Sequence, residues 1–160
     1  MIRQMRASDY EAMAAIYRQS LEKGNVTFQM TCPTYVEWDA SHIPTCRLVF
    51  EEDGRVVGYA MIAPTSSRDC YRGVAESSVY VDETYRRRGI GRTLLSALMA
   101  EARAEGFWML YAAIFSNNEA SIRLHKACGF RVIGTRERIA RDRFGQWQST
   151  TVMEWRNDID

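Results

Sequence analysis

The chain has 160 residues, of which 46% are hydrophobic and 26% charged, and its net charge is +1. This length suits a sizeable core, so we expect one domain over residues 1–160. The balanced charge argues against a nucleic-acid partner or a membrane-surface partner, and no apolar run is long enough to span a membrane. The N-terminus also lacks a signal-peptide core.

Four widely spaced cysteines and two histidines form no Cys-x-x-Cys pair and no metal-ligand pattern, so we expect no metal site. Because nothing in the sequence indicates export, we expect reduced thiols and a cytoplasmic location.

Strand and helix patterns follow one another along the chain. We predict strands over 2–5, 47–51, 56–63, 74–81, 107–115, 130–134 or beyond, and 147–155. We predict helices that begin near 8, 34, 91 and 119 and end near 24, 44, 106 and 128. The almost unbroken apolar run over 107–115 indicates a strand buried on both faces. The order of the elements predicts an α/β fold with a mixed sheet.

Local signals mark several boundaries. Ser8 with Glu11, and Thr34 with Glu37, have the spacing of a helix capping box. The Asp-Gly pair at 53–54 predicts a tight hairpin between two strands.

A basic, glycine-bearing turn follows the strand over 74–81. Gly89 and Gly91 leave the first N–H groups of the next helix facing outward, where the positive end of the helix dipole suits a phosphate or pyrophosphate. Further positive charge comes from Arg86, Arg87, Arg88 and Arg92. The alternative is a solvated basic turn before a surface helix.

Two common nucleotide loops are excluded at this turn. The dinucleotide fingerprint needs a third glycine where the chain has Leu94, and no Gly-Lys-Ser/Thr tripeptide of a P-loop occurs. The remaining pattern, Arg86-x-x-Gly89-x-Gly91, resembles the pyrophosphate loop of the GCN5-related N-acetyltransferases (GNAT).

A second motif agrees with this resemblance. Asn118 precedes a helix that ends at Gly129-Phe130, which is similar to the Asn-x-x-Ala/Ser…Gly-Phe element of the same family. The resemblance implies a single-domain GNAT fold, in which helices flank both faces of a mixed central sheet. Within the family the chain looks most like the phosphinothricin-type acetyltransferases, in the segments 76–81, 123–125 and at Trp147. It departs from them after Trp147, where Gln148-Ser149 replaces an Asp-containing pair.

The resemblance implies acetyl-CoA as acyl donor and a set of residues around it. It places the cofactor contacts at Val79, Tyr80, Val81, Arg86, Arg87, Arg88, Gly89, Ile90, Gly91, Arg92 and Asn118. It makes Glu76 the general base and His125 an assisting residue.

Acyl transfer to an amine needs a base, because an aliphatic ammonium keeps its proton near neutral pH. Strand alternation puts Glu76, Ser78 and Tyr80 on one face, and partial burial of Glu76 would raise its pKa towards the working pH. The alternative is a structural ion pair of Glu76 with an arginine. His125 either protonates the departing thiolate, holds a water or is an ordinary helix histidine.

The residues expected to bind the substrate lie on two connections. Arg68, Tyr71 and Arg72 precede the Glu76 strand, and an arginine there suits a substrate carboxylate. The alternative is a solvent-exposed loop. Phe28 either lines the pocket or anchors its own loop.

We therefore expect an N-acetyltransferase that acts on the primary amine of a small molecule, an amino acid or an analogue such as phosphinothricin or a methionine derivative. The alternatives are acetylation of a protein N-terminus or lysine, and a non-catalytic acyl-CoA-binding module. Relatives of this type are commonly dimers, so we expect a homodimer. Val152, Met153 and Trp155 serve either its interface or the core.

Overall fold

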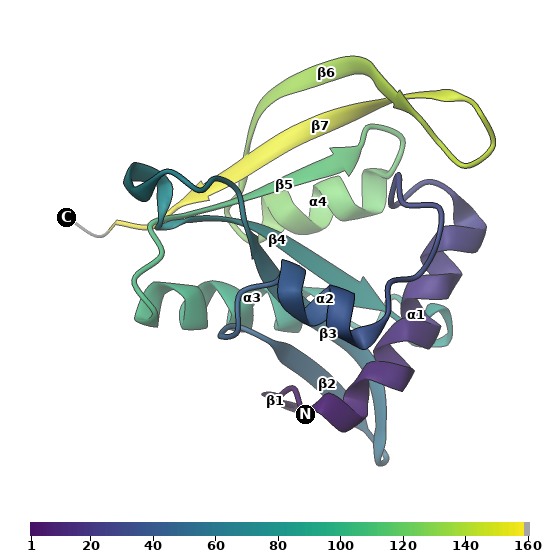
Figure 1. Cartoon of the computed structure of the whole chain (residues 1–160), viewed down its shortest axis with the longest axis vertical. Coiled ribbons are helices and arrows are strands. Elements are labelled where there is room, and N and C mark those ends of the chain that lie inside the picture. The colour runs from purple at the N-terminus through teal and green to yellow at the C-terminus, as the bar shows by residue number, and fades with distance from the viewer. Residues whose placement is uncertain (159–160) are drawn as a thin grey trace.

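A seven-stranded mixed sheet forms the centre of the computed structural model, which describes residues 1–158 (Figure 1). Its strands are β1 (Ile2–Gln4), β2 (Leu48–Glu52), β3 (Arg55–Pro64), β4 (Val74–Val81), β5 (Met109–Phe115), β6 (Arg131–Arg141) and β7 (Trp147–Arg156). They lie in the order β1-β2-β3-β4-β5-β7-β6. The β4–β5 pair is parallel and the other neighbouring pairs are antiparallel.

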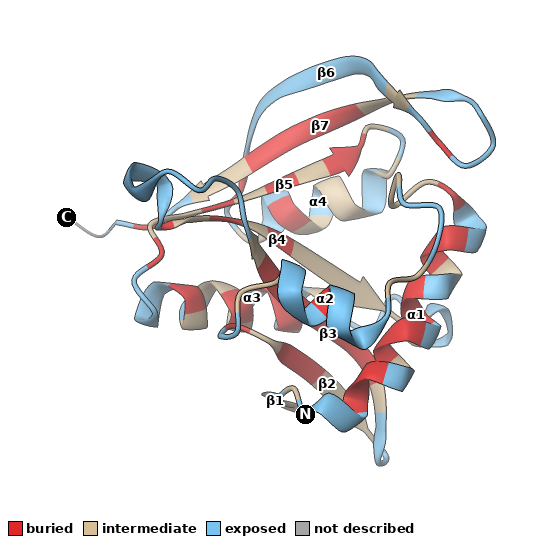
Figure 2. Ribbon diagram, viewed as in Figure 1, coloured by how far each residue is buried: buried red, intermediate tan, exposed pale blue. Residues whose placement is uncertain are grey.

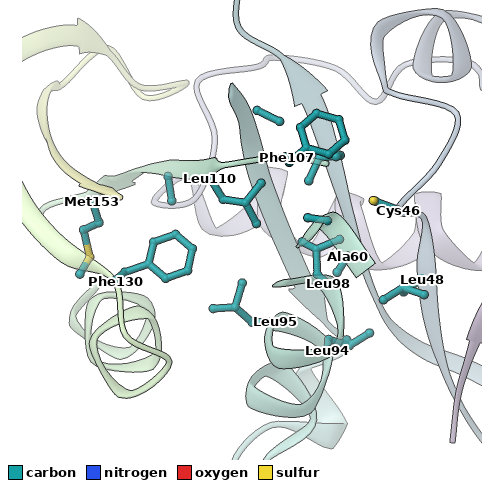
Figure 3. Packing of buried hydrophobic residues seen from close by; sticks show 14 of the residues in the cluster. Cys46, Leu48, Ala60, Leu94, Leu95, Leu98, Phe107, Leu110, Phe130 and Met153 are labelled. Atoms are coloured by element: carbon teal, nitrogen blue, oxygen red, sulfur yellow. The ribbon is translucent and has the colours of Figure 1, made fainter. Parts of the chain in front are cut away.

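Helices cover both faces of this sheet, which confirms the predicted fold class. The main helices are α1 (Tyr10–Lys23), α2 (Tyr35–Ser41), α3 (Ile90–Ala104) and α4 (Glu119–Ala127), and short 3-10 turns are η1 (Ala7–Asp9), η2 (Asp69–Tyr71) and η3 (Glu83–Tyr85). In one core layer α3 packs on the sheet through Leu94, Leu95 and Leu98, which belong to the same buried cluster as Leu110 and Met153 (Figure 3). The other layer joins α1 and α2 to the opposite face.

The local signals account for most boundaries. Thr34 and Glu37 form the predicted capping box at the start of α2, because the Thr34 side chain accepts from the Glu37 N–H at 3.3 Å. Asp53 and Gly54 both have a positive φ, at 49° and 76°, as a two-residue hairpin of type I′ requires.

The capping box predicted at Ser8 and Glu11 is wrong. Residues 7–9 form the 3-10 turn η1, and α1 begins only at Tyr10 with no side-chain cap hydrogen bond. The carboxylate of Asp9 takes the role predicted for Glu11, two positions earlier, since its Oδ2 accepts from the Arg6 N–H at 2.7 Å. Sequence spacing alone does not distinguish a serine cap from a neighbouring aspartate that turns the chain first.

The C-terminal hairpin shows whether the apolar residues of its last strand serve the core or a dimer interface. Val152 and Met153 are buried in the core, and Trp155 packs against it. Exposed apolar side chains lie instead on the neighbouring strand β6, which is exposed along nearly all its length (Figure 2), in the turn at Phe144 and at Trp147, the first residue of β7.

The strands β4 and β5 position the site, because they separate along their length. They pair only between Val74–Glu76 and Met109–Tyr111, although β4 continues to Val81 and β5 to Phe115. Figure 1 shows the two strands starting together and diverging towards their C-terminal ends.

The predicted burial of β5 on both faces is wrong. Leu110, Ala112 and Ile114 are buried on one face, whereas Tyr111 and Ala113 on the other face are half-buried.

Candidate active site

A cavity of about 230 Å³ lies where β4 and β5 separate. Six of the residues predicted for the site line it: Phe28, Glu76, Val79, Tyr80, Asn118 and His125. They come from the loop after α1, from β4 and from α4, so the fold gathers segments that are far apart in the sequence.

Glu76 is the titratable group at the centre of this region. Its side chain is half-buried, and its Oε2 accepts a hydrogen bond of 3.2 Å from the Tyr111 hydroxyl. Burial raises the pKa of Glu76, while the Tyr111 hydrogen bond and the positive charge of Arg136 act in the opposite direction. No ion pair of Glu76 with an arginine occurs among the described residues, so the structural alternative for this carboxylate loses its basis. A carboxylate of raised pKa in a cavity suits proton transfer.

His125 is 4% exposed, and burial lowers the pKa of its imidazole, which favours the neutral form near pH 7. Its Nδ1 lies 2.7 Å from the Ser121 carbonyl oxygen, which only accepts, so Nδ1 carries the ring proton. Nε2 then has a lone pair and no proton to give. This tautomer favours holding a water over protonating a departing thiolate.

The glycine-bearing turn has the geometry of an anion site. Gly89 is the residue before α3 and has a φ of 77°, in the left-handed region that favours glycine. The N–H groups of the first helical turn have no partner within the helix and point outward at the positive end of its dipole. Gly91 lets α4 approach, because a Cβ there would lie 3.3 Å from Leu124 Cδ2.

The side chains of this turn do not all face a ligand. Arg86, Arg87 and Arg92 are exposed and form no ion pair within residues 1–158. Arg88 pairs with Glu52 at 3.3 Å and lies over the Tyr85 ring. Ile90 is buried in the core, so only its backbone is available to a cofactor.

The strand edge facing the opening offers further donors and acceptors. Beyond Glu76, β4 is paired with β3 on one side and with no strand on the other. The free N–H and C=O groups of residues 77–81 suit an extended chain of amides, such as the pantetheine arm of coenzyme A. The site therefore combines an anion-binding helix terminus, an unpaired strand edge and a carboxylate of raised pKa.

A family model described as "Acetyltransferase (GNAT) family" matches residues 10–130. The chain belongs to this family.

Three known proteins are similar to this chain over more than two thirds of its length. An L-methionine sulfoximine/L-methionine sulfone acetyltransferase of Salmonella typhimurium is 42% identical over 69% of this chain, which is 64% of the relative's length. A GNAT superfamily phosphinothricin acetyltransferase of Sinorhizobium meliloti, solved in complex with acetyl-CoA, is 31% identical, with a TM-score of 0.88 over 98% of this chain and 87% of that one. A ribosomal-protein-alanine N-acetyltransferase of Brucella melitensis is 34% identical, with a TM-score of 0.89 over 98% and 99% of the chains.

The GNAT chain does not bring all its predicted substrate residues to the cavities. Phe28 lines the first cavity and packs on Phe115, with the ring centroids 4.4 Å apart. Arg68, Tyr71 and Arg72 are exposed. They line neither this cavity nor the second cavity described below. Arg68 lies over the Tyr71 ring and Arg72 over the Trp108 ring. Their role in substrate binding stays a prediction.

Two residues near Glu76 were missed from the sequence. Tyr111 is paired with Glu76 across the parallel β4–β5 ladder, and alternation along β5 would have placed it on the same face. Arg136 lies opposite Thr150, which in turn lies opposite Phe115, so the three follow one line across β6, β7 and β5. The prediction left the end of this strand open, at 134 or beyond; β6 in fact extends to Arg141, so Arg136 lies within the strand.

A second cavity of about 470 Å³ lies on the α1 and α2 side of the sheet. Glu76, Ser78 and Tyr80 border both cavities, as expected from their common face of β4. Glu76 thus lies at the border between the strand opening and this second cavity, which we call the chamber.

Within residues 1–158 no helix is long and apolar enough to cross a membrane. The same residues contain no group of three or more His, Cys, Asp or Glu placed to hold a metal ion.

Proposed function

We propose that this chain transfers the acetyl group of acetyl-CoA to the primary amine of a small molecule, an amino acid or an amino-acid analogue. The observation that carries the proposal is Glu76, a carboxylate of raised pKa between the opening beside β4 and a second cavity. The named activities of the methionine sulfoximine and phosphinothricin relatives support it.

In the proposed reaction each part of the site has one task. The first turn of α3 holds the pyrophosphate, and the free edge of β4 aligns the pantetheine arm. When bound, acetyl-CoA supplies the acetyl group as a thioester. A backbone N–H of β4 stabilises negative charge that develops on the carbonyl oxygen.

Glu76 makes the acceptor nucleophilic. It takes one proton from the ammonium, directly or through a water, and the neutral nitrogen forms the new bond to the acetyl carbon. The carbon–sulfur bond breaks, its electron pair leaves with the thiolate, and the second proton of the acylated nitrogen passes to the thiolate or to solvent. Because a thiol has a pKa of about 8.5, this leaving group needs little protonation near neutral pH.

The test combines titration calorimetry with acetyl-CoA and a free-thiol release assay over a panel of amines. The panel contains phosphinothricin, methionine sulfoximine, methionine sulfone, common amino acids, and peptides with a free N-terminal alanine or lysine. We expect binding of acetyl-CoA and the fastest thiol release with an amino acid or analogue. Faster release with the peptides would favour a protein substrate. Binding without release on any amine would favour an acyl-CoA-binding module.

We also propose that the chain acts as one N-acetyltransferase domain over residues 1–160, of which 159 and 160 lie outside the described residues. A cytoplasmic location is supported by its four cysteines, which are all free thiols. Fractionation of expressing cells tests the location.

The proposed homodimer is best supported by β6, which is an edge strand of the sheet. Val132, Ile133 and Ile139 on this strand are 43%, 49% and 44% exposed, and exposed apolar side chains that gather on one element favour an interaction surface. Sedimentation equilibrium of the wild type and of Ile133→Glu tests this: a dimer that the variant converts to a monomer supports it, and a monomeric wild type contradicts it.

A further inference from the structure

The second cavity is larger than the catalytic step requires. At about 470 Å³ it falls within the usual range of small-molecule sites. It lies between α1, α2 and the strands β3 and β4, and Glu76 is at its border with the strand opening. Moving one proton from an amine needs only Glu76 itself, so the remaining space is available to another part of the acceptor.

The walls of this chamber are dominated by aromatic rings. Tyr59 and Tyr80 are stacked with their centroids 5.1 Å apart, and Tyr10 and Trp38 are tilted at 5.8 Å. Met61 adds a thioether, and sulfur makes favourable contacts with aromatic groups. Such walls offer ring edges and faces for offset or edge-to-face packing against a further ring.

The charges of the chamber exclude an anionic occupant. Among the described residues that line it there is no arginine and no lysine, and its carboxylates are Glu37 and Glu76. His42 also borders it, but burial lowers the pKa of this imidazole and keeps it neutral. A carboxylate or phosphinate placed there would lose water without gaining a positive partner. Glu76 is needed for the amine, and Glu37 lies at the exposed rim, bonded to Thr34.

We propose that this chamber binds an aromatic side chain of the acceptor, so that the preferred substrate is an aromatic amino acid or a related aryl-bearing primary amine. The inference rests on the proposed function, since it needs the amine at Glu76. The acid group of the amino acid then stays outside the chamber.

The register of the strands gives the ring a suitable place. Ala63 pairs with Glu76, Met61 with Ser78, and Tyr59 with Tyr80. Each two-residue step along a strand is about 7 Å. A ring one side-chain length from the amine therefore lies level with Met61, between the base and the Tyr59–Tyr80 stack.

The test compares L-phenylalanine with L-alanine, which share the amine and the acid and differ only in the ring. We expect kcat/KM for L-phenylalanine to exceed that for L-alanine by roughly 10- to 100-fold, the range expected for burying a phenyl group. Ala14 on α1 is 3% exposed and lines the chamber, so Ala14→Leu fills it. This variant should lower the ratio of the two kcat/KM values by about 10-fold.

Ala15→Leu is the matched control, because the same change is made on the same helix at an exposed position outside the lining. It should leave the ratio unchanged. Melting curves of both variants monitor folding, and Ala14→Val repeats the test with a smaller side chain if Ala14→Leu does not fold.

The outcomes separate the two proposals. Thiol release with L-alanine at least as fast as with L-phenylalanine overturns the inference and leaves the proposed function standing. The same holds if Ala14→Leu and Ala15→Leu change the ratio equally. No thiol release with any amine overturns the proposed function, and the inference with it.

Discussion

At the scale of single residues, the proton-transfer chemistry depends on the surroundings of Glu76. Its carboxylate is half-buried beside the Tyr111 hydroxyl and within the field of Arg136. The position of Glu76 could be predicted from its strand beside the glycine turn. Tyr111 and Arg136 come close only when β4, β5 and β6 are assembled, and no local pattern around either residue predicts that neighbourhood.

The first prediction is that Glu76→Gln abolishes most turnover and leaves the cofactor affinity near that of the wild type. Glutamine keeps the shape of the side chain but cannot accept the proton, so kcat should fall by ~10²–10⁴-fold. The acidic limb of the pH–rate profile should disappear, because it reports loss of the proton from the base. In the wild type this limb should lie above the ordinary carboxyl range, since burial raises the pKa of Glu76. Stopped-flow or thiol-release assays over a range of pH measure the turnover rate and the position of this limb.

The control for this prediction is Glu119→Gln, the same change at an exposed position of α4. Glu119→Gln should retain both the acidic limb of the pH–rate profile and the turnover rate of the wild type. Near-normal turnover with an unshifted acidic limb in Glu76→Gln would rule out Glu76 as the base.

The second prediction concerns Tyr111→Phe. The Tyr111 hydroxyl donates to Glu76 and lowers its pKa, so its removal should raise the pKa further. The base is active when deprotonated, and the acidic limb should therefore move to higher pH, with most of the rate recovered at alkaline pH. Tyr35→Phe on the exposed side of α2 should leave the limb in place. A downward shift in Tyr111→Phe would contradict the assigned hydrogen bond.

At the scale of elements, the start of α3 shows how far a motif can be interpreted from sequence. Gly89 lies before the helix with a positive φ, as the predicted turn requires, whereas Gly91 is already the second residue of α3. The side chains around them were less predictable: Ile90 turns into the core, and Arg88 is drawn to Glu52 on the distant strand β2. The sequence signals for the start of a helix also differed in reliability. The capping box predicted at Thr34 is present, and the one predicted at Ser8 is absent.

The third prediction is that Gly89→Ala weakens acetyl-CoA binding far more than its effect on folding explains. Gly89 has a φ of 77° and open space around its Cβ position, so the cost comes from the left-handed backbone, roughly 1–2 kcal/mol. Relief of that strain would rotate the N–H groups away from the pyrophosphate. Gly106→Ala is a matched control at the other end of α3, with a φ of 89° and the same open surroundings.

Melting curves should show a similar loss of stability in the two variants, whereas calorimetry should show a loss of affinity of at least 10-fold only in Gly89→Ala. Equal acetyl-CoA affinities in the two variants would contradict the assignment of the turn to the pyrophosphate.

At the scale of the whole molecule, the order and type of the elements could be predicted, and the two cavities could not. Periodicity and turn residues report on neighbours along the chain, and they predicted most strands and helices within a few residues, although the end of β6 stayed open. The opening depends on where β4 and β5 stop pairing, after Glu76 and Tyr111. The chamber depends on side chains from α1, α2, β3 and β4 that fail to fill the space between them. Both cavities therefore depend on how the helices and strands pack together, which local sequence patterns do not report.

The stability of the whole fold also carries a pH dependence that can be assigned. Asp9 links the first strand to the first helix, because its two oxygens accept from Arg3 Nη1 and Nη2 at 2.9 Å each and from the Arg6 N–H at 2.7 Å. The hydrogen bonds from Arg3 are the largest cause of a lowered pKa for Asp9. A group whose pKa is lower in the folded state stabilises the fold above its unfolded pKa, here 3.8, and loses that contribution as pH falls through the folded value.

The last prediction is that Asp9→Asn lowers the melting temperature at neutral pH and flattens its decline below about pH 5. Loss of hydrogen bonds to a charged group costs roughly 1.5–3 kcal/mol, and each kcal/mol corresponds to roughly 2–4 °C at this chain length. Asp69→Asn is the control, since the Asp69 side chain is 92% exposed and its ion pair with Arg72 lies on the surface. Calorimetric melting from pH 3 to pH 7 compares the three proteins. If Asp9→Asn runs parallel to the wild type across this range, the Arg3–Asp9 link does not contribute to acid stability.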